Sequence, residues 1–221
     1  MKDTIIFDMD GVIFNSEPLY IQEIIGFFKR NNILLSEKEV SRMVGVDDTM
    51  YERLLIEWWG NTSSKEELFQ RYERYEASLK RDYTKILNPH IVSLLNYLKK
   101  NQYKIALASN SHRELLDLAL SQTNLVSYFD NITSGEQFVN SKPNPEIYLH
   151  TVKALHSTVE NCLIIEDSSP GIEAANRAKI DVLALVDTQY GIDQSQATGK
   201  INTLLEVIEY LEGQLLLTKN K

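Results

Sequence analysis

Short runs of consecutive apolar residues recur along the chain and are separated by stretches with helical periodicity. The clearest runs cover residues 5–7, 105–108, 163–165 and 182–186, and a shorter one covers 131–133. Continuous apolar strands are expected where helices cover both faces of a parallel sheet, because neither face then meets water. The pattern therefore predicts an α/β core built on a parallel sheet.

Residues 16–83 interrupt this alternation, since they contain helical patterns and no convincing strand. A capping box is expected at Ser36, with a glutamate three residues later, and a strongly charged helix is expected over residues 65–81. A helical insertion between the first and second strands implies a separate small domain. We therefore expect a Rossmann-like parallel-sheet core of residues 1–15 and 84–221, with an inserted α-helical cap domain at residues 16–83.

The composition excludes several classes of protein. The chain has 221 residues and a net charge of -8, which argues against a nucleic-acid binder because phosphate backbones require clustered Lys and Arg. No stretch approaches the roughly 18 apolar residues of a membrane span, and the N-terminus does not resemble a signal peptide. One cysteine, Cys162, cannot form an intramolecular disulfide. We expect a cytoplasmic protein, with a monomer as the default state.

Two aspartates follow the first predicted strand, in the order Asp8-Met9-Asp10-Gly11. In an open parallel sheet, ligands bind beyond the carboxyl ends of the strands, so both carboxylates lie where chemistry is expected. Gly11 allows a turn that brings the two side chains together, and two like charges at close range favour a hard divalent cation between them. The alternative is a strand-end turn with two solvated acids, and this motif alone does not separate the two.

Two further polar motifs occur at the ends of predicted strands or before predicted helices. Ser109-Asn110-Ser111 leads into a helix whose start resembles a capping box; we assign Ser109 to phosphate binding and Ser111 to helix capping alone. Lys142 directly precedes Pro143, which restricts the lysine backbone to an extended conformation and can direct its side chain. Lys142 would supply the positive charge that an otherwise acidic site lacks.

Glu166 and Asp167 follow the apolar run of residues 163–165, again at a strand end. Carboxylates from two strand ends, together with a substrate oxygen and waters, are what an octahedral Mg²⁺ site requires. No glycine-rich dinucleotide or P-loop pattern occurs, so the kinase and oxidoreductase classes have little support. The motifs, taken in order, resemble the four motifs of the haloacid dehalogenase superfamily: Asp8-Met9-Asp10-Gly11-Val12, Ser109-Asn110, Lys142-Pro143 and Glu166-Asp167-Ser168.

The resemblance implies a phosphotransferase in which Asp8 attacks phosphorus and forms an aspartyl phosphate, while Asp10 acts as the general acid and base. The implied cofactor is Mg²⁺, and the implied partner is a small phosphorylated metabolite. The implied metal ligands are Asp8, the backbone carbonyl of Asp10, Asp167 and, directly or through water, Glu166. The implied phosphoryl-binding residues are Ser109, Asn110 and Lys142.

The superfamily members with a helical cap include beta-phosphoglucomutases and sugar-phosphate phosphatases, which share this core. In the mutases a histidine usually stands where this chain has Tyr20, and the cap loop usually runs Gly-Val-Ser-Arg. The candidate cap and substrate residues here are Tyr20, Gly45, Val46, Asp47 and Asp48. An acid in place of a phosphate-binding arginine is unfavourable in sign and in reach, although Arg42 or Arg53 could compensate.

We therefore favour a phosphatase that hydrolyses small phosphomonoesters, with sugar phosphates as the preferred class. The alternative is a beta-phosphoglucomutase that interconverts beta-glucose 1-phosphate and glucose 6-phosphate. A non-catalytic binding module is the remote alternative, since such a protein would be expected to lack at least one of Asp8, Asp10, Lys142 and Asp167, and all four are present.

Overall fold

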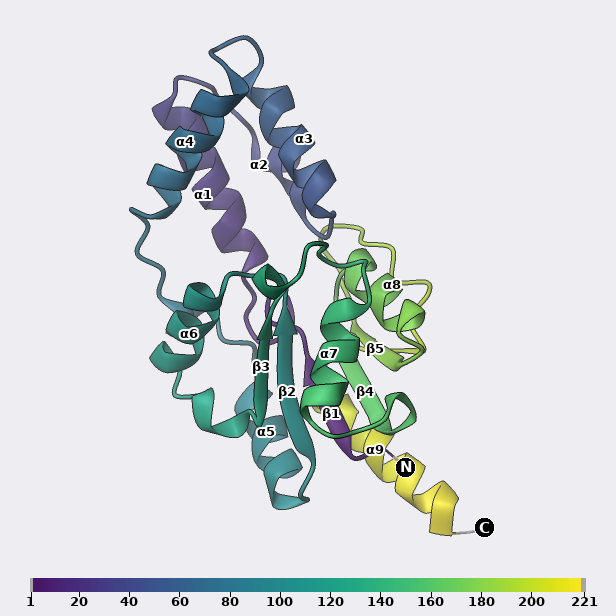
Figure 1. Ribbon diagram of the computed structural model, residues 1–221. Coiled ribbons are helices and arrows are strands. Elements are labelled where there is room, and N and C mark those ends of the chain that lie inside the picture. The colour runs from purple at the N-terminus through teal and green to yellow at the C-terminus, as the bar shows by residue number, and fades with distance from the viewer. Residues whose placement is uncertain (1, 220–221) are drawn as a thin grey trace.

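The computed structural model describes residues 2–219 and shows a helical region above the edge of a single β-sheet (Figure 1). The six strands are all parallel, in the order β3-β2-β1-β4-β5-β6. Their bounds are Thr4–Phe7 (β1), Lys104–Ser109 (β2), Asn131–Ser134 (β3), Cys162–Glu166 (β4), Asp181–Leu185 (β5) and Gly199–Ile201 (β6). The five predicted strands are confirmed as β1 to β5, and only β6 was not predicted.

Helices cover both faces of the sheet, as the continuous apolar strands predict. Successive side chains of a strand point to opposite faces, so Ile5 and Phe7 join one buried cluster and Ile6 joins the other. The helices on the first face are α5 (Ile91–Lys100), α6 (Arg113–Gln122) and α9 (Glu206–Lys219), and those on the second are α7 (Glu146–Ala154) and α8 (Ser169–Arg177). Short 3₁₀ turns lie at Ser41–Met43, Tyr83–Lys85, Val126–Tyr128, Gly135–Gln137 and Val159–Asn161.

The inserted residues form a helical region with its own apolar core. Its helices are α1 (Glu17–Arg30), α2 (Glu37–Val40), α3 (Asp48–Trp59) and α4 (Lys65–Glu76). Phe27 lies at the centre, stacked on Trp59 with ring centroids 5.9 Å apart and in edge contact with Tyr72 at 5.0 Å. The α/β fold with an inserted helical region is thus confirmed, while the exact limits of a cap domain at residues 16 and 83 stay a prediction.

Two local predictions in the helical region have different outcomes. The capping box at Ser36 is confirmed, because the Ser36 hydroxyl accepts from the Glu39 N–H and the Glu39 side chain accepts from the Ser36 N–H. The charged helix over residues 65–81 was wrong at its C-terminal end, since α4 ends at Glu76. The Ser78 hydroxyl donates to the Tyr75 carbonyl at 2.6 Å, and the chain then turns back toward the sheet.

The helices of the described residues include none that is both long and apolar enough to cross a membrane.

Candidate active site

The carboxyl ends of β1, β2 and β4 meet at the edge of the sheet below the helical region (Figure 1). In the sheet register, Phe7 lies opposite both Leu107 and Ile165, so the residues after it meet Ser109 and Glu166 at the same edge. A cavity of about 440 Å³ opens there, lined from below by the strand ends and from above by the helical region. This volume lies in the range of small-molecule sites, about 300–1,000 Å³.

Three carboxylates converge at the base of the cavity. Asp8, Glu166 and Asp167 each place an oxygen within 4.8 Å of the others, and Asp8 and Glu166 are buried. Burial raises the pKa of Asp8 to about 8 against the opposing effect of Lys142, and burial together with the Glu166 charge raises the pKa of Asp167 well above its usual range. Clustered carboxylate oxygens, two of them on groups with raised pKa values, fit a hard divalent cation such as Mg²⁺, which would relieve their repulsion.

Gly11 leaves the space in which this cluster forms. Its φ of +73° is a left-handed conformation that favours glycine, and an added Cβ would lie 1.9 Å from Oδ2 of Asp167. The turn that was expected to bring the aspartates together therefore also admits a carboxylate from a different strand.

Lys142 is the positive charge of the site. Its side chain is 4% exposed, and Nζ donates to Asp8 Oδ1 at 2.6 Å, to Glu166 Oε1 at 2.8 Å and to the Ala108 carbonyl at 3.0 Å. Burial opposes its charged form, but Asp8 and Glu166 outweigh burial and hold the pKa of Lys142 well above its usual value. The structure thus places the cation Lys142 against the predicted nucleophile.

Glu166 is held by protein donors on both of its oxygens. Oε1 accepts from Lys142 and from the Tyr148 hydroxyl at 2.9 Å, while Oε2 accepts from the N–H groups of Asp167 and Ser168 at 2.9 and 3.0 Å. Burial alone would raise the pKa of Glu166, but Lys142 lowers it below the usual value, so the group is an anion. These contacts position Lys142; direct ligation of a metal by Glu166 stays a prediction.

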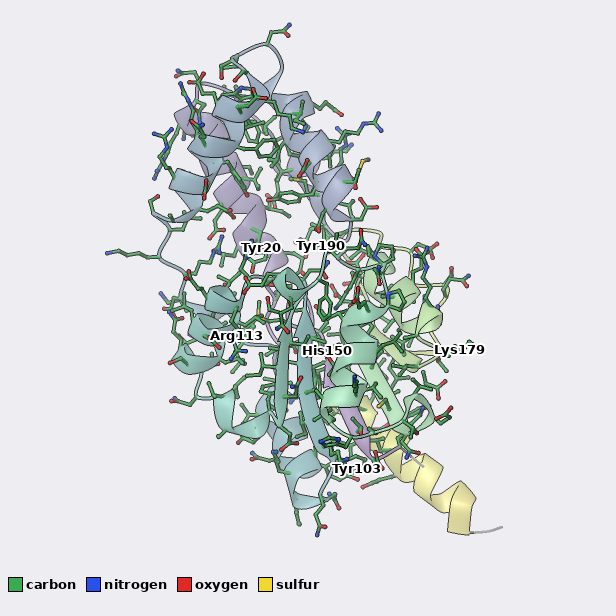
Figure 2. All side chains as sticks on the ribbon, in the orientation of Figure 1. Tyr20, Tyr103, Arg113, His150, Lys179 and Tyr190 are labelled. Carbon is green, nitrogen blue, oxygen red and sulfur yellow. The ribbon has the colours of Figure 1, made fainter. Side chains whose placement is uncertain are left out.

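Asp10 lies beside the carboxylate cluster, and three hydroxyl groups donate to its carboxylate. Ser16 and Tyr20 donate to Oδ1, both at 2.8 Å, and Ser111 donates to Oδ2 at 2.9 Å. Figure 2 shows Tyr20 on the end of α1 that faces the sheet, so one of the donors comes from the helical region. The three contacts fix the orientation of the predicted acid and base.

The assignment of Ser111 to helix capping alone was wrong. Helix α6 begins one residue later than expected, with His112 as its N-cap and no capping side chain. The Ser111 hydroxyl donates to Asp10 Oδ2 at 2.9 Å, and the later start of α6 leaves Ser111 outside the N-cap position.

Ser109 and Asn110 line the cavity as predicted, but each also has a local structural contact. The Ser109 hydroxyl accepts from the Ser111 N–H at 3.1 Å, and Asn110 Oδ1 accepts from the Lys142 N–H at 3.2 Å. Asn110 therefore holds the backbone of the lysine in place. Phosphoryl binding by Ser109 and Asn110 stays a prediction.

The helical region contributes most of the predicted cap residues to the cavity. Tyr20, Gly45, Val46 and Asp48 line it, whereas Asp47 does not. The Asp47 side chain accepts from the Met50 N–H at 2.8 Å and caps α3.

Neither arginine proposed as compensation lies among the residues that line the cavity. Arg42 forms an exposed ion pair with Glu57 at 3.0 Å, and Arg53 is exposed. The cavity instead receives Arg81, which the sequence pattern did not single out. Further lining residues that were missed are Glu17, Glu23, Tyr51, Tyr72 and Glu76.

The fold and the four motifs that meet at the acidic site together define a class of protein. The family model described as "Haloacid dehalogenase-like hydrolase" matches residues 5–185, most of the chain. The chain therefore belongs to the haloacid dehalogenase-like hydrolases, which confirms the family and the enzyme class predicted from the four motifs.

Individual relatives place the chain more narrowly within that family. It is 32% identical to the "Phosphorylated carbohydrates phosphatase" of Thermotoga maritima over 201 residues, which cover 90% of this chain and 88% of the relative. It is 28% identical to "Hexitol phosphatase B" of Escherichia coli K12, with 79% of each chain covered. Among solved structures, the beta-phosphoglucomutase of Clostridium difficile is similar over the full length of both chains, with a TM-score of 0.78 and 26% identity.

Proposed function

We propose that this protein is a Mg²⁺-dependent phosphatase that hydrolyses small phosphomonoesters, with sugar phosphates as the preferred class, through an aspartyl-phosphate intermediate. The observation that carries the proposal is the contact of 2.6 Å between Lys142 Nζ and Asp8 Oδ1 at the base of the cavity, beside Asp167 and Glu166. A carboxylate fixed by a cation, next to further carboxylates that suit a metal, is arranged for in-line attack on phosphorus.

In the first half-reaction, an Asp8 oxygen forms a bond to phosphorus while the bond from phosphorus to the ester oxygen breaks. Asp10 gives its proton to that oxygen, so the substrate leaves as an alcohol. In the second half-reaction, Asp10 takes a proton from water, whose oxygen attacks phosphorus, and the bond to Asp8 breaks. Lys142 holds its charge throughout and offsets the negative charge on the phosphoryl oxygens.

When bound, Mg²⁺ would neutralise charge on Asp8, Asp167 and the phosphoryl group. Asp8 and Asp167 are the side chains that we assign to it, with the Asp10 carbonyl and Glu166 as further candidates. The hydroxyls of Ser16, Tyr20 and Ser111 would keep Asp10 oriented toward the ester oxygen.

Two observations favour hydrolysis over isomerisation: the names of similar proteins, and the lack of an unpaired cation from the helical region among the described residues that line the cavity. Two of the similar proteins are named as phosphatases, one of phosphorylated carbohydrates and one of hexitol phosphates. A mutase must also bind a second phosphate, and the cation that the helical region brings to the cavity, Arg81, is already paired with Glu23. The similarity to the Clostridium difficile mutase keeps the mutase as the second candidate.

The test is phosphate release from a panel of phosphomonoesters with Mg²⁺ and with chelator, using Asp8→Asn as the inactive control. The panel includes beta-glucose 1-phosphate, with glucose 6-phosphate followed in parallel. We expect Mg²⁺-dependent release that falls by about 10³-fold or more in the variant. Isomerisation without net release would establish the mutase instead, and undiminished turnover in Asp8→Asn would refute the nucleophile.

A further inference from the structure

The part of the cavity that the helical region lines contains an ion-paired arginine beside two hydroxyl groups. Arg81 donates to both carboxylate oxygens of Glu23, with Nε 2.9 Å from Oε1 and Nη2 2.8 Å from Oε2, and both side chains are 12% exposed. Glu76 lies 3.6 Å from the same guanidinium. The Tyr51 and Tyr72 hydroxyls are hydrogen-bonded at 2.6 Å, and all five residues line the cavity.

The charge of this part of the cavity is negative. Two carboxylates of described residues that line the cavity, Glu23 and Glu76, lie against the single guanidinium of Arg81, whereas Glu17 lies at the base of the cavity beside Asp167. Glu23 binds the planar guanidinium through two parallel hydrogen bonds, and Glu76 faces it as well. These two carboxylates offset the positive charge of Arg81, so the group does not attract an anion. A second phosphate placed here would meet uncompensated carboxylates at close range.

The same groups suit hydroxyl-bearing ligands. Carboxylate oxygens accept from sugar or polyol hydroxyls, and the bonded pair of tyrosine hydroxyls keeps one proton to donate and lone pairs to accept. Apolar side chains next to them, from Ile24, Met43 and Val44, offer a surface for the C–H faces of a carbohydrate.

The geometry points to Glu23, Glu76 and Arg81 as specificity-determining residues that select monophosphates of uncharged, hydroxyl-rich alcohols and reject compounds with a second phosphate. This inference rests on the proposed phosphatase activity and adds the residues that select the alcohol and the exclusion of a second phosphate. The rejection comes from like charge in the cavity, and the hydroxyl groups of Tyr51 and Tyr72 take the place that a phosphate-binding cation would need.

The experiment compares kcat/KM for matched pairs: glucose 6-phosphate with glucose 1,6-bisphosphate, and fructose 6-phosphate with fructose 1,6-bisphosphate. The wild-type protein should prefer each monophosphate by about tenfold or more. Glu23→Gln removes one carboxylate and frees the Arg81 charge, so the preference should fall by about tenfold. Glu76→Gln should lower it less, because its side chain is 45% exposed.

The matched control is Glu57→Gln, which removes the same charge from the helical region but at a position that does not line the cavity. It should leave the preference as in the wild-type protein. Glu76→Gln provides a second test if Glu23→Gln fails to fold, since it leaves the pair of Glu23 and Arg81 intact. Thermal unfolding of each variant shows whether it is folded.

The inference is overturned if both glutamine variants keep the wild-type preference, or if the wild-type protein prefers a bisphosphate. A preference for glucosamine 6-phosphate over glucose 6-phosphate would also overturn it, because the carboxylates would then recognise a cation rather than hydroxyl groups. If none of these compounds, nor p-nitrophenyl phosphate, releases phosphate in a Mg²⁺-dependent way, the proposed function itself fails. An active enzyme that does not distinguish monophosphates from bisphosphates would instead overturn only the inference about selectivity.

Discussion

Replacement of Asp167 by Asn tests whether the carboxylate cluster is built for a metal. Asp167 lies within 4.8 Å of Asp8 and Glu166, and the raised pKa of Asp167 reflects burial and their charges. Two like charges no more than 4.8 Å apart repel each other by at least about 3 kcal/mol at an effective dielectric constant of 20. Because Asn has nearly the same shape without the charge, the metal-free variant should be more stable than the metal-free wild-type protein by about that amount.

The expected shift can be measured as a melting temperature. For a chain of this size, 1 kcal/mol corresponds to about 2–4 °C, so Asp167→Asn in chelator should melt about 6–12 °C higher than the wild-type protein. Mg²⁺ at about 100 times its dissociation constant should stabilise the wild-type protein by about 2.7 kcal/mol, and the variant far less. Differential scanning calorimetry in chelator and in Mg²⁺ gives all four values.

A matched control is Asp117→Asn, since Asp117 is an exposed carboxylate paired with Arg113 on α6. Its effect on stability should stay within about 0.5 kcal/mol in both conditions. The reasoning is refuted if Asp167→Asn melts lower than the wild-type protein in chelator, or if it keeps the full Mg²⁺ shift.

Three further predictions follow from the contacts around the site. Lys142→Met should abolish phosphate release and lower the free energy of unfolding by about 3–5 kcal/mol in a urea titration, because Glu166 loses its buried counterion; stability equal to wild type would contradict this. Tyr20→Phe should lower kcat by about tenfold with KM nearly unchanged, because Asp10 loses one of three oriented donors; a change in KM alone would contradict this role. Gly171→Ala should destabilise the protein by more than about 2 kcal/mol by thermal unfolding, since the new Cβ would lie 1.6 Å from Oε1 of Glu166, and a neutral effect would show that the carboxylate has room to move.

The sheet and the acids at its edge could be predicted because both depend on local sequence. Runs such as residues 163–165 are apolar on both faces only in a buried strand, and the polar residues directly after them must lie at the carboxyl edge. Strand β6 was missed because it has three residues, one of them buried, and so carries no apolar run. The register that brings Asp8 beside Glu166 then follows from parallel pairing.

Contacts between distant residues could not be predicted from local patterns. Ser111 can cap a helix or donate to a carboxylate, and only the position of Asp10, 101 residues earlier, decides between the two. Likewise, Glu23 and Arg81 are 58 residues apart, and nothing near either residue indicates the other. Tyr72 packs its ring against the apolar core of the helical region, yet the residue also lines the cavity, because a tyrosine side chain has an apolar body and a polar tip.

The pair of Glu23 and Arg81 also joins the two places where the chain passes between the sheet and the helical region. Glu23 lies in the second turn of α1, shortly after the first passage, and Arg81 lies just before the second. Gln122 of α6 binds the backbone on both sides of Asp82, donating to the Arg81 carbonyl at 3.0 Å and accepting from the Tyr83 N–H at 2.9 Å. If the helical region moved relative to the sheet, the ion pair would couple the two passages, and the hydrogen bonds of Gln122 would oppose the movement. We therefore expect a substitution at Glu23 or Arg81 to weaken the link between the two passages as well as to change the charge in the cavity.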